Sequence, residues 1–491
     1  MRVLLMVPPG IFLQGEMPFC TFPLGIGYLA SVLRKNNHEV SVIDCLTEDQ
    51  TVINHKDGMC TIGMPWETIK EKLRDIKPEI VGISNSYSVQ APSVLKLAEF
   101  VKRNCNTRVV LGGAHPSALP QGILKNENID FVIIGEGEES FLALVNSLKE
   151  SKSLETIEGL AYRMNGGIKL NPKKCYISNL DNIPFPSWDL FSAIEKYLYS
   201  RNPHSNFLRR TPYMPVLTSR GCPGNCIFCS IHVSFGFRWR SRTCQNVVDE
   251  IELLVKEHGI KEIHFEDDNL TFDRARMMDI CNEIIARKID IAWTTPNGVH
   301  ISNLDEELLS KMKESGCYRL FLGIESGNTN VLRNIIRKID ISLDEAKSKI
   351  RLMKKLKIET VGFFVIGLPG ETKKEIRDTI NFACSLGLDD VLFNIASAYP
   401  GTDLWRFYNK DDNSSLDYYA RLRPKCAAQP TDLLTIDEIE SLRNEAYLKF
   451  EIHKFFRNPV RYILIKENLL NWKRYLKYFF TSLINKKFKK R

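Results

Sequence analysis

Residues 220–229 read Arg220-Gly221-Cys222-Pro223-Gly224-Asn225-Cys226-Ile227-Phe228-Cys229. The three cysteines of this stretch place three thiolates on one short loop, where they can bind three irons of a cubane 4Fe-4S cluster. Cluster chemistry normally uses four cysteines, so a loop with three leaves one iron open to a small molecule. The glycines and the proline allow a tight fold around a bulky inorganic core. We therefore predict that Cys222, Cys226 and Cys229 are metal ligands.

A zinc site is the alternative interpretation of this loop. His232 follows Cys229 with two residues between them, so a Cys3His ligand set is formally possible. However, the spacing is tighter than in ordinary zinc modules, and the loop lies inside a long alternation of strands and helices. Both features favour the cluster.

The chain around the loop repeats strand and helix six times between residues 211 and 400. The predicted strands are 213–218, 262–265, 289–293, 318–322, 360–365 and 391–395. Every cluster of unusual residues in this region follows the C-terminal end of one of these strands. Barrel enzymes assemble their sites at that face, so the pattern predicts a partial (βα)6 barrel with its site there.

The cysteine loop, with Phe228 before its last cysteine, resembles the signature of the radical S-adenosylmethionine (SAM) enzymes. Three further stretches, over about residues 215–404, resemble motifs of that family: Phe265-Glu266-Asp267-Asp268, Gly323-Ile324-Glu325-Ser326-Gly327 and Gly367-Leu368-Pro369-Gly370-Glu371. The resemblance implies that the open iron binds the amino and carboxylate groups of SAM. It also implies that an electron, from a donor such as flavodoxin or ferredoxin, cleaves SAM to a 5′-deoxyadenosyl radical.

The expected SAM contacts lie at three strand ends. Acids after the second strand would accept hydrogen bonds from the ammonium group of SAM. The Glu-Ser pair after the fourth strand would hold the ribose or the amino-acid part of SAM. A glycine turn after the fifth strand would let the backbone reach adenine. These residues are Glu266, Asp267, Glu325, Ser326 and Gly367. Taken singly, each acid is equally a helix N-cap or a solvated loop residue, and Asp268 and Asn269 are good cap candidates. Arg242, in another family-like stretch, would contact a carboxylate or phosphate, or pair with an acid.

Residues 1–150 also alternate between strand and helix. The predicted strands are 3–7, 40–43, 80–83, 108–111 and 131–134, and the predicted helices are 24–35, 93–103 and 140–148. This alternation predicts a Rossmann-like, doubly wound α/β domain with a parallel sheet. Ligands bind such sheets at the carboxyl ends of the strands, and most of those ends here carry Gly, Pro or Ser.

Three stretches of this region, 22–30, 110–116 and 130–138, resemble the cobalamin-binding domain fused to many radical SAM enzymes. The resemblance covers about residues 1–150 and implies cobalamin as a cofactor. The expected cobalamin contacts are Ser84, Gly112, Gly113, Gly135, Glu136 and Gly137. The sequence has no Asp-x-His-x-x-Gly run, which supplies the lower cobalt ligand in other cobalamin domains. We therefore expect base-off cobalt without a protein histidine, and we expect His115 to be a packing or tail-contacting residue.

The remaining segments are assigned by composition and pattern. Residues 151–210 are expected to connect the domains, with a hairpin around Asn165-Gly166-Gly167 and a stiff Pro-rich bridge over 181–188. We expect the barrel to occupy residues 211–404, and residues 405–491 to form a helical C-terminal extension over or beside it. Cys426 is interpreted as structural.

The composition, 44% hydrophobic and 26% charged, is that of a soluble globular protein. The thirteen mostly isolated cysteines fit a reducing cytosol, and no apolar run is long enough to predict a signal peptide or a spanning helix. Residues 453–491 contain twelve Lys or Arg and one acid, whereas the preceding residues carry 55 bases and 58 acids. The near-neutral body argues against an enzyme that wraps nucleic acid.

The basic segment 453–491 is also rich in aromatic residues, and three interpretations of it stay open. It can lie on an anionic membrane surface, pack on the barrel as an amphipathic helix, or contact RNA through its aromatic rings. Nucleic acid is the least favoured. Pro459 is expected to divide the segment into two helices. We expect a cytoplasmic enzyme with peripheral contact at the inner membrane surface.

Together the resemblances imply a cobalamin-dependent radical SAM enzyme, of the group that contains C-methyltransferases and the anaerobic isocyclic-ring cyclase of chlorophyll synthesis. We expect methylation of an unactivated carbon, with a second SAM recharging the cobalamin, and a lipid or isoprenoid substrate would explain the basic segment. Ring closure or C–C bond formation without methyl transfer is the alternative within enzymes. A binding protein that has lost the chemistry is the alternative of another class, and the three intact cysteines argue against it.

Overall fold

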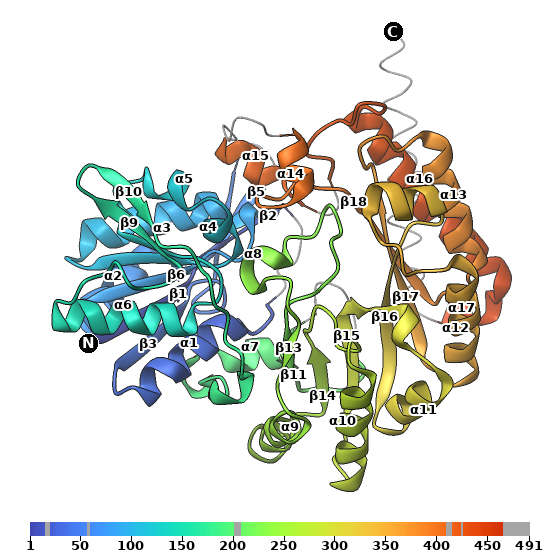
Figure 1. Cartoon of the computed structure of the whole chain (residues 1–491), viewed down its shortest axis with the longest axis horizontal. Coiled ribbons are helices and arrows are strands. Elements are labelled where there is room, and N and C mark those ends of the chain that lie inside the picture. The colour runs from blue at the N-terminus through green and yellow to red at the C-terminus, as the bar shows by residue number, and fades with distance from the viewer. Residues whose placement is uncertain (15–19, 56–58, 201–207, 409–414, 424–425, 465–491) are drawn as a thin grey trace.

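The computed structural model describes residues 1–14, 20–55, 59–200, 208–408, 415–423 and 426–464. Two α/β units lie side by side, an N-terminal unit built on a seven-stranded sheet and a second unit built on a six-stranded sheet (Figure 1). The loop with the three cysteines leads into helix α8 (Ile231–Phe235), which lies between the two units. The α/β fold expected from the sequence is confirmed.

The sheet of the first unit has the order β10-β9-β8-β7-β6-β1-β3. Its five parallel strands follow the chain order 2-1-3-4-5 of flavodoxin-like sheets, which bind ligands where the strand order reverses. That point lies between β1 and β6. The strands are β1 (Arg2–Val7), β3 (Glu39–Asp44), β6 (Ile80–Ser84), β7 (Arg108–Gly112), β8 (Phe131–Ile133), β9 (Leu160–Met164) and β10 (Gly167–Leu170).

The hairpin predicted around Asn165 is confirmed as the antiparallel pair β9 and β10, and β9 also pairs with β8, so the hairpin extends the first sheet. A second, three-stranded antiparallel sheet has no counterpart among the sequence predictions. It consists of β2 (Gly10–Leu13), β4 (Thr51–Asn54) and β5 (Met59–Gly63). These strands are short, and β4 is exposed along its whole length, so no alternation of apolar residues marks them.

Helices cover both faces of the first sheet, as a doubly wound fold requires. Helices α1 and α6 bury their apolar sides in one core, and α2 and α3 bury theirs in the core on the opposite face. The helical segments are α1 (Leu24–Lys35), α2 (Trp66–Ile76), η1 (Ser88–Gln90), α3 (Ala91–Asn104), α4 (Ala114–Ala118), α5 (Pro120–Leu124), α6 (Glu138–Glu150), η2 (Leu180–Asn182), η3 (Trp188–Leu190) and α7 (Ile194–Leu198).

The second sheet is a partial barrel of six parallel strands in chain order, as predicted. The strands are β11 (Tyr213–Val216), β14 (Glu262–Phe265), β15 (Ala292–Val299), β16 (Cys317–Glu325), β17 (Glu359–Ile366) and β18 (Asp390–Ile395). Some boundaries were wrong. The first strand was expected to reach Thr218, whereas β11 ends at Val216, and the fourth was expected to end at Leu322, whereas β16 continues to Glu325. The third strand was expected at 289–293 with residues 294–298 as its loop. These residues continue β15 through two shifts of register, the second between Thr295 and Val299, where Pro and Gly are tolerated.

Helices line the outer side of the barrel sheet (Figure 1). They are α9 (Cys244–His258), α10 (Arg274–Ala286), α11 (Glu306–Glu314), α12 (Leu343–Lys355) and α13 (Lys373–Ser385). Two short segments follow β15 and β16, namely η4 (Ile301–Asn303) and the π-helix η5 (Val331–Ile336), and η5 shares a core with the cysteine loop. A short antiparallel ladder of β12 (Ser219–Arg220) and β13 (Arg240–Ser241) stands apart from the sheet. It closes the base of residues 221–239, which we call the cluster loop.

The C-terminal extension covers the free edge of the last barrel strand. Its helices are α14 (Asp403–Tyr408), α15 (Leu416–Arg421), α16 (Ile436–Arg457) and α17 (Pro459–Leu464). The backbone N–H of Phe393 on β18 donates to the Tyr447 hydroxyl at 3.0 Å, and Arg443 donates to the Phe393 carbonyl at 2.9 Å. Side chains of α16 therefore bond the edge strand, which would otherwise expose unpaired backbone groups.

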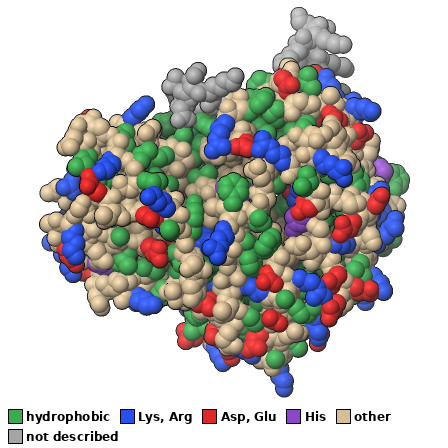
Figure 2. Space-filling model, viewed as in Figure 1, with side chains coloured by type: hydrophobic (Ala, Val, Ile, Leu, Met, Phe, Trp, Pro, Cys, Tyr) green, Lys and Arg blue, Asp and Glu red, His purple; other side chains and the backbone are tan. Residues whose placement is uncertain are grey.

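The predicted break at Pro459 is confirmed, since α16 ends at Arg457 and α17 begins at Pro459. The rest of the basic segment, residues 465–491, lies outside the described residues. Within the described ranges, no helix combines the length and the apolar run needed to span a bilayer. Basic and acidic side chains are interspersed on the face shown in Figure 2, as the near-neutral body predicts.

The turn between β17 and α13 is held by the buried side chain of Glu371. Its Oε2 accepts the backbone N–H groups of Gly367 at 2.8 Å and Leu368 at 3.1 Å, whereas Oε1 has no partner in the described part of the chain. Burial raises the pKa of Glu371 to about 8, and the two backbone donors oppose that rise only in part. The carboxyl group is therefore protonated in the folded protein at neutral pH.

We predict that Glu371→Gln removes part of the pH dependence of the free energy of unfolding. The folded protein holds this proton up to about pH 8, whereas the unfolded chain releases it near the ordinary pKa of 4.5. The wild type therefore loses stability as pH rises between these values. Glutamine accepts the same two N–H groups without titrating, so urea unfolding above neutrality should favour the variant by on the order of a few kcal/mol.

Glu375→Gln is the matched control for this measurement. Glu375 accepts the Thr372 N–H, which lowers its pKa, so its loss should destabilise the protein at neutral pH. Identical pH profiles for wild type and Glu371→Gln would contradict the assignment of the raised pKa.

Candidate functional site

The cluster loop is tied to barrel elements that follow it at long distances in the chain. The Ile227 N–H donates to the Ile336 carbonyl at 3.3 Å, and the Leu404 N–H donates to the Ile227 carbonyl at 2.9 Å. Within the loop, the Cys229 N–H donates to the Cys226 carbonyl at 3.0 Å. Phe228 packs on an apolar core shared by the first unit, the barrel and the C-terminal extension. The conformation of the cysteine loop is therefore set by the whole fold.

The three thiols are partly buried and close enough to affect one another. Burial raises the pKa of Cys226 to about 11 and that of Cys229 to about 12, and it also raises the pKa of Cys222. The nearby Lys338 ammonium opposes the rise at Cys222 and Cys226. Iron binds the thiolate, so cluster binding must displace the thiol protons of the three cysteines. The positive charge of Lys338 favours the loss of these protons.

The zinc alternative is not supported. Among the described residues, no three His, Cys, Asp or Glu side chains converge on a point where a single ion could bind. His232 instead stacks on Phe237, with ring centroids 3.6 Å apart. In a cubane cluster each cysteine binds its own iron, so three cysteines spread along one loop fit the cluster.

Two buried polar atoms beside Cys222 lack a hydrogen-bond partner in the described part of the chain, Asp268 Oδ2 and Asn269 Oδ1. Burial raises the pKa of Asp268 to about 8, and the neighbouring acids add to the rise. Unpaired buried polar atoms cost free energy, and these two fit a polar ligand next to the cluster. The expectation that both residues cap a helix was wrong, because Asp273 caps α10.

Asp267, an expected SAM contact, is bonded by neighbouring residues of the chain. Its Oδ1 accepts the Thr218 hydroxyl at 2.7 Å and its Oδ2 accepts the Thr218 N–H at 3.1 Å, while the Ser219 hydroxyl also bonds Oδ1. The buried carboxylate thus holds the chain between β11 and the cluster loop, and its contact with SAM stays a proposal. Glu266, at the end of β14, is partly exposed and stays a proposed SAM contact.

The end of β16 separates its two expected residues. Glu325 adopts a left-handed backbone at φ +68°, uncommon outside glycine, and its Oε1 meets Lys338 Nζ at 3.2 Å. Both charges act on Cys226, so this pair borders the cluster. The buried hydroxyl of Ser326 lies 2.8 Å from that of Thr379 on α13, and its contact with SAM stays a proposal.

Gly367 also has a structural role. Its N–H donates to Glu371, which leaves its carbonyl for the adenine contact, and that contact stays a proposal. At φ +77°, a Cβ at this position would lie 2.9 Å from Ile439 on α16. The glycine is needed for the close packing of the C-terminal extension.

Three of the expected cobalamin residues lie together at the carboxyl edge of the first sheet. Ser84 on β6 pairs with Gly112 on β7, and Gly113 follows directly. Asn85 lies among them with its side chain buried, and neither its amide oxygen nor its nitrogen has a partner in the described part of the chain. A Cβ at Gly113 would lie 2.6 Å from the Asn85 carbonyl, so only glycine permits this approach. The unpaired amide fits cobalamin, which carries many amide groups.

Tyr87 stands at the same edge, close to the barrel. Its side chain is 67% exposed, yet desolvation raises the pKa of its phenol, with the Glu266 carboxylate adding to the rise. Tyr87 of the first unit therefore lies near Glu266 of the barrel.

The other three expected cobalamin residues point to different tasks. The Gly135 N–H bonds the Ser117 hydroxyl at 2.9 Å, and Gly137 precedes α6, where a Cβ would crowd Leu29 at 3.2 Å. The buried carboxylate of Glu136 faces two arginines at the base of the cluster loop, and its contact with cobalamin stays a proposal. These residues shape the turn after β8.

The arginines are Arg220 and Arg240, one on each strand of the ladder β12–β13. Glu136 Oε1 lies 3.2 Å from Arg220 Nη1 and 2.7 Å from Arg240 Nη1, and Arg220 Nη2 reaches Glu138 at 2.6 Å. At most 7% of each of these side chains is exposed. The first unit thus binds both ends of the cluster loop through buried charges.

Two further residues have clear roles. Arg242 pairs with the buried Glu250 inside the barrel, which is one of its two expected alternatives. His115 is a packing residue, since its ring meets Tyr419 of the C-terminal extension edge-on at 4.7 Å and its Nδ1 lies 3.0 Å from the Ser88 hydroxyl.

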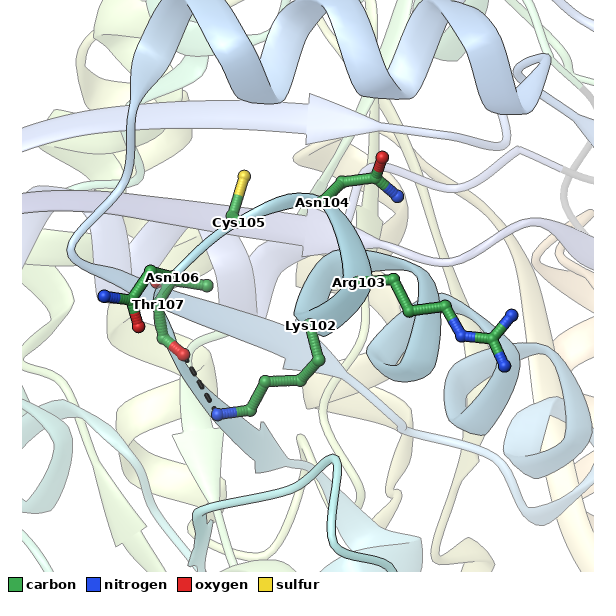
Figure 3. A pocket seen from close by; sticks show the side chains of 6 residues that line it. All are labelled: Lys102, Arg103, Asn104, Cys105, Asn106 and Thr107. Atoms are coloured by element: carbon green, nitrogen blue, oxygen red, sulfur yellow. Dashed lines mark hydrogen bonds between the residues drawn. The ribbon is translucent and has the colours of Figure 1, made fainter.

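Asn85, Tyr87 and Lys338 are the site residues that the sequence motifs do not mark. Asn85 and Tyr87 follow a predicted strand end, and that position is their only signal in the sequence. A separate surface pocket, lined by residues 102–107 at the end of α3, contains none of them (Figure 3). Lys102 there donates to the Thr107 carbonyl of the same short segment at 3.0 Å.

Comparison with known proteins agrees with this geometry. Residues 216–383 match the radical SAM superfamily, and residues 11–145 match the B12 binding domain. An uncharacterised methyltransferase of Pyrococcus horikoshii is 34% identical over 92% of each chain. Cytidylyl-2-hydroxyethylphosphonate methyltransferase of Streptomyces wedmorensis is 33% identical, over 82% of this chain and 81% of its own.

Two more distant similarities bear on the reaction and the fold. Anaerobic magnesium-protoporphyrin IX monomethyl ester cyclase of Rubrivivax gelatinosus is 28% identical over 83% of this chain and 70% of its own. The radical SAM methyltransferase TsrM of Kitasatospora setae, solved with cobalamin and a 4Fe-4S cluster, shares the fold with a TM-score of 0.65 at 19% identity, over 83% of this chain and 78% of its own. The chain belongs to the cobalamin-binding radical SAM enzymes, whose cofactors are a 4Fe-4S cluster, SAM and cobalamin.

Proposed function

We propose that this enzyme methylates an unactivated carbon of a lipid or other small molecule, with SAM as the methyl source and cobalamin as the carrier. The observation that carries the proposal is the approach of the cobalamin edge to the barrel residues that are expected to bind SAM. The Glu266 carboxylate of the barrel acts on the Tyr87 phenol of the first unit, two residues after the unpartnered amide of Asn85. The Glu325–Lys338 pair acts on Cys226. The two methyltransferases similar to most of this chain support methyl transfer.

The residues of the chain bind and position the reactants. When bound, the cluster supplies the electron that cleaves SAM, and cobalamin carries the methyl group. Cys222, Cys226 and Cys229 hold the cluster, and Glu266 and Glu325 accept hydrogen bonds from the SAM ammonium. No acid–base pair is required at the substrate carbon, so positioning and the exclusion of water are what the protein adds.

A lipid substrate is supported by the surface of the C-terminal extension. Phe456 and Val460 are 77% and 69% exposed, next to Lys454 and Arg457 and ahead of the basic, aromatic residues 465–491. Apolar and basic side chains together suit peripheral contact with an anionic membrane. We also propose a reduced flavodoxin or ferredoxin as the electron donor.

Ring closure without methyl transfer is the second candidate. It is favoured by the similarity to the anaerobic cyclase, which covers most of this chain. Such a reaction would remove two hydrogens from the substrate and would leave the methyl group of SAM on methionine.

We predict that replacing Cys222, Cys226 and Cys229 together by Ala abolishes the cluster. After anaerobic reconstitution the wild type should hold about four irons per chain, and the variant close to none. Formation of 5′-deoxyadenosine under a strong reductant should be lost with the iron. Iron analysis and chromatography of the nucleosides measure both quantities.

The matched control replaces three other cysteines that are not buried, Cys175, Cys244 and Cys426. This control should keep its iron and its SAM cleavage. Iron retained by the first variant, or lost by the control, would contradict the assignment of the ligands.

We predict that the enzyme forms S-adenosylhomocysteine and 5′-deoxyadenosine in similar amounts, because one SAM supplies the methyl group and another supplies the radical. The assay uses SAM with a deuterated methyl group and separate lipid and aqueous extracts as substrate sources. A labelled methyl group in a lipid is the expected product by mass spectrometry. Label only in the aqueous fraction would overturn the lipid proposal. A product two hydrogens lighter, without S-adenosylhomocysteine, would overturn methyl transfer and support ring closure.

A further inference from the structure

We infer that Glu136 is a positioning residue that fixes the distance and orientation between the cluster and the cobalamin. The inference rests on the binding of both cofactors by one chain and does not depend on the substrate. It follows from where Glu136 lies, which residues it bonds, and what those residues hold.

Glu136 belongs to the cobalamin side of the molecule. It is the third residue after β8, at the carboxyl edge that carries Ser84, Asn85 and Gly113. The N–H of Gly135 before it is bonded to Ser117, and the residue after it precedes α6. The carboxylate is therefore attached to a part of the first unit that is itself firmly held.

The partners of Glu136 belong to the cluster side. Arg220 and Arg240 are direct neighbours across the ladder β12–β13, and the cluster loop runs from one to the other. A single oxygen, Oε1, contacts both guanidinium groups, at 3.2 Å and 2.7 Å. The other oxygen accepts the Ile177 N–H at 2.9 Å, so both carboxylate oxygens are used.

The connection from the contact of Glu136 with Arg220 and Arg240 to the cysteines is short and tightly packed. Cys222 is two residues from Arg220. Gly221 between them has φ +84°, and a Cβ there would lie 2.4 Å from the Arg238 carbonyl. The Arg220 guanidinium also lies over the rings of Tyr28 and Phe235, at 5.5 Å and 5.2 Å. A shift at the base of the loop is therefore passed on to the cluster ligands.

Neutralising Glu136 leaves two buried guanidinium groups side by side without the charge between them. Removing one partner of a buried ion pair leaves an uncompensated charge, which favours movement or hydration of the site. Arg220 keeps its bond to Glu138 at 2.6 Å, so the loop should remain attached to the first unit. We expect the cofactors to stay bound while their separation changes or becomes heterogeneous.

The test uses the full-length enzyme reconstituted with iron, sulfide and cobalamin and then reduced. Reduction yields a paramagnetic cluster and paramagnetic cob(II)alamin, whose magnetic interaction depends steeply on their distance and orientation. Pulsed electron paramagnetic resonance measures it as faster relaxation of the cobalt signal. We predict one well-defined interaction in the wild type, and a weaker or broadened one in Glu136→Gln at unchanged iron and cobalt content.

Glu262→Gln is the matched control, because it neutralises an equally buried glutamate that bonds His264 and Tyr318 at the start of β14, at the opposite end of the strand from the expected SAM site. This control should lower thermal stability but leave the magnetic interaction as in the wild type. If Glu136 only stabilised the fold, Glu136→Gln would give that same result. Glu138→Gln is the milder variant and should give a smaller change in the same direction. An unchanged interaction in Glu136→Gln with both cofactors bound would overturn the inference. If Glu136→Gln does not fold, an unchanged interaction in Glu138→Gln would overturn it.

Discussion

The contact on which the arrangement of this enzyme depends is the buried carboxylate of Glu136 between Arg220 and Arg240. Burying three charged groups is costly, and the contact is favourable only because geometry and additional hydrogen bonds are good on every side. Those conditions hold here, since Glu138, the Ile177 backbone and aromatic rings complete the set. The same contact joins the cobalamin unit to the base of the loop that carries the cluster cysteines. Two folds that could pack in many ways are thereby set in one orientation.

Within that orientation, the carboxyl edges of the two sheets lie near each other, since Glu266 of the barrel acts on Tyr87 of the first unit. Parallel strands end there in both sheets, and it is at strand ends that such folds bind ligands. Hydrogen bonding separates the polar residues of these edges into two groups. Asp267 and Ser326 bond the protein itself and hold turns, whereas Asp268, Asn269 and Asn85 keep atoms without partners in the described part of the chain. The second group marks where cofactors complete the structure.

Much of the fold could be predicted from the sequence, because strand and helix periodicity is a local property. The six barrel strands and the three-cysteine loop were found this way, and the parallel strands of the first sheet were found from their apolar runs. The roles of single side chains could not be predicted, because they depend on partners distant in the chain. Glu136 and Asp267 look like ligand contacts by position, but Arg220 and Thr218 engage them. Asn85 has no motif, and only its burial without partners reveals it.

The most direct test of this account is the metal content of the anaerobically purified enzyme, reconstituted with iron, sulfide and cobalamin. The account requires both cofactors on one chain. It therefore predicts about four irons, the content of one cubane cluster, together with equimolar cobalt that gives a base-off spectrum. The same iron without cobalt would contradict it, because the edge formed by Ser84, Asn85 and Gly113 would then bind no cobalamin and could not serve methyl transfer.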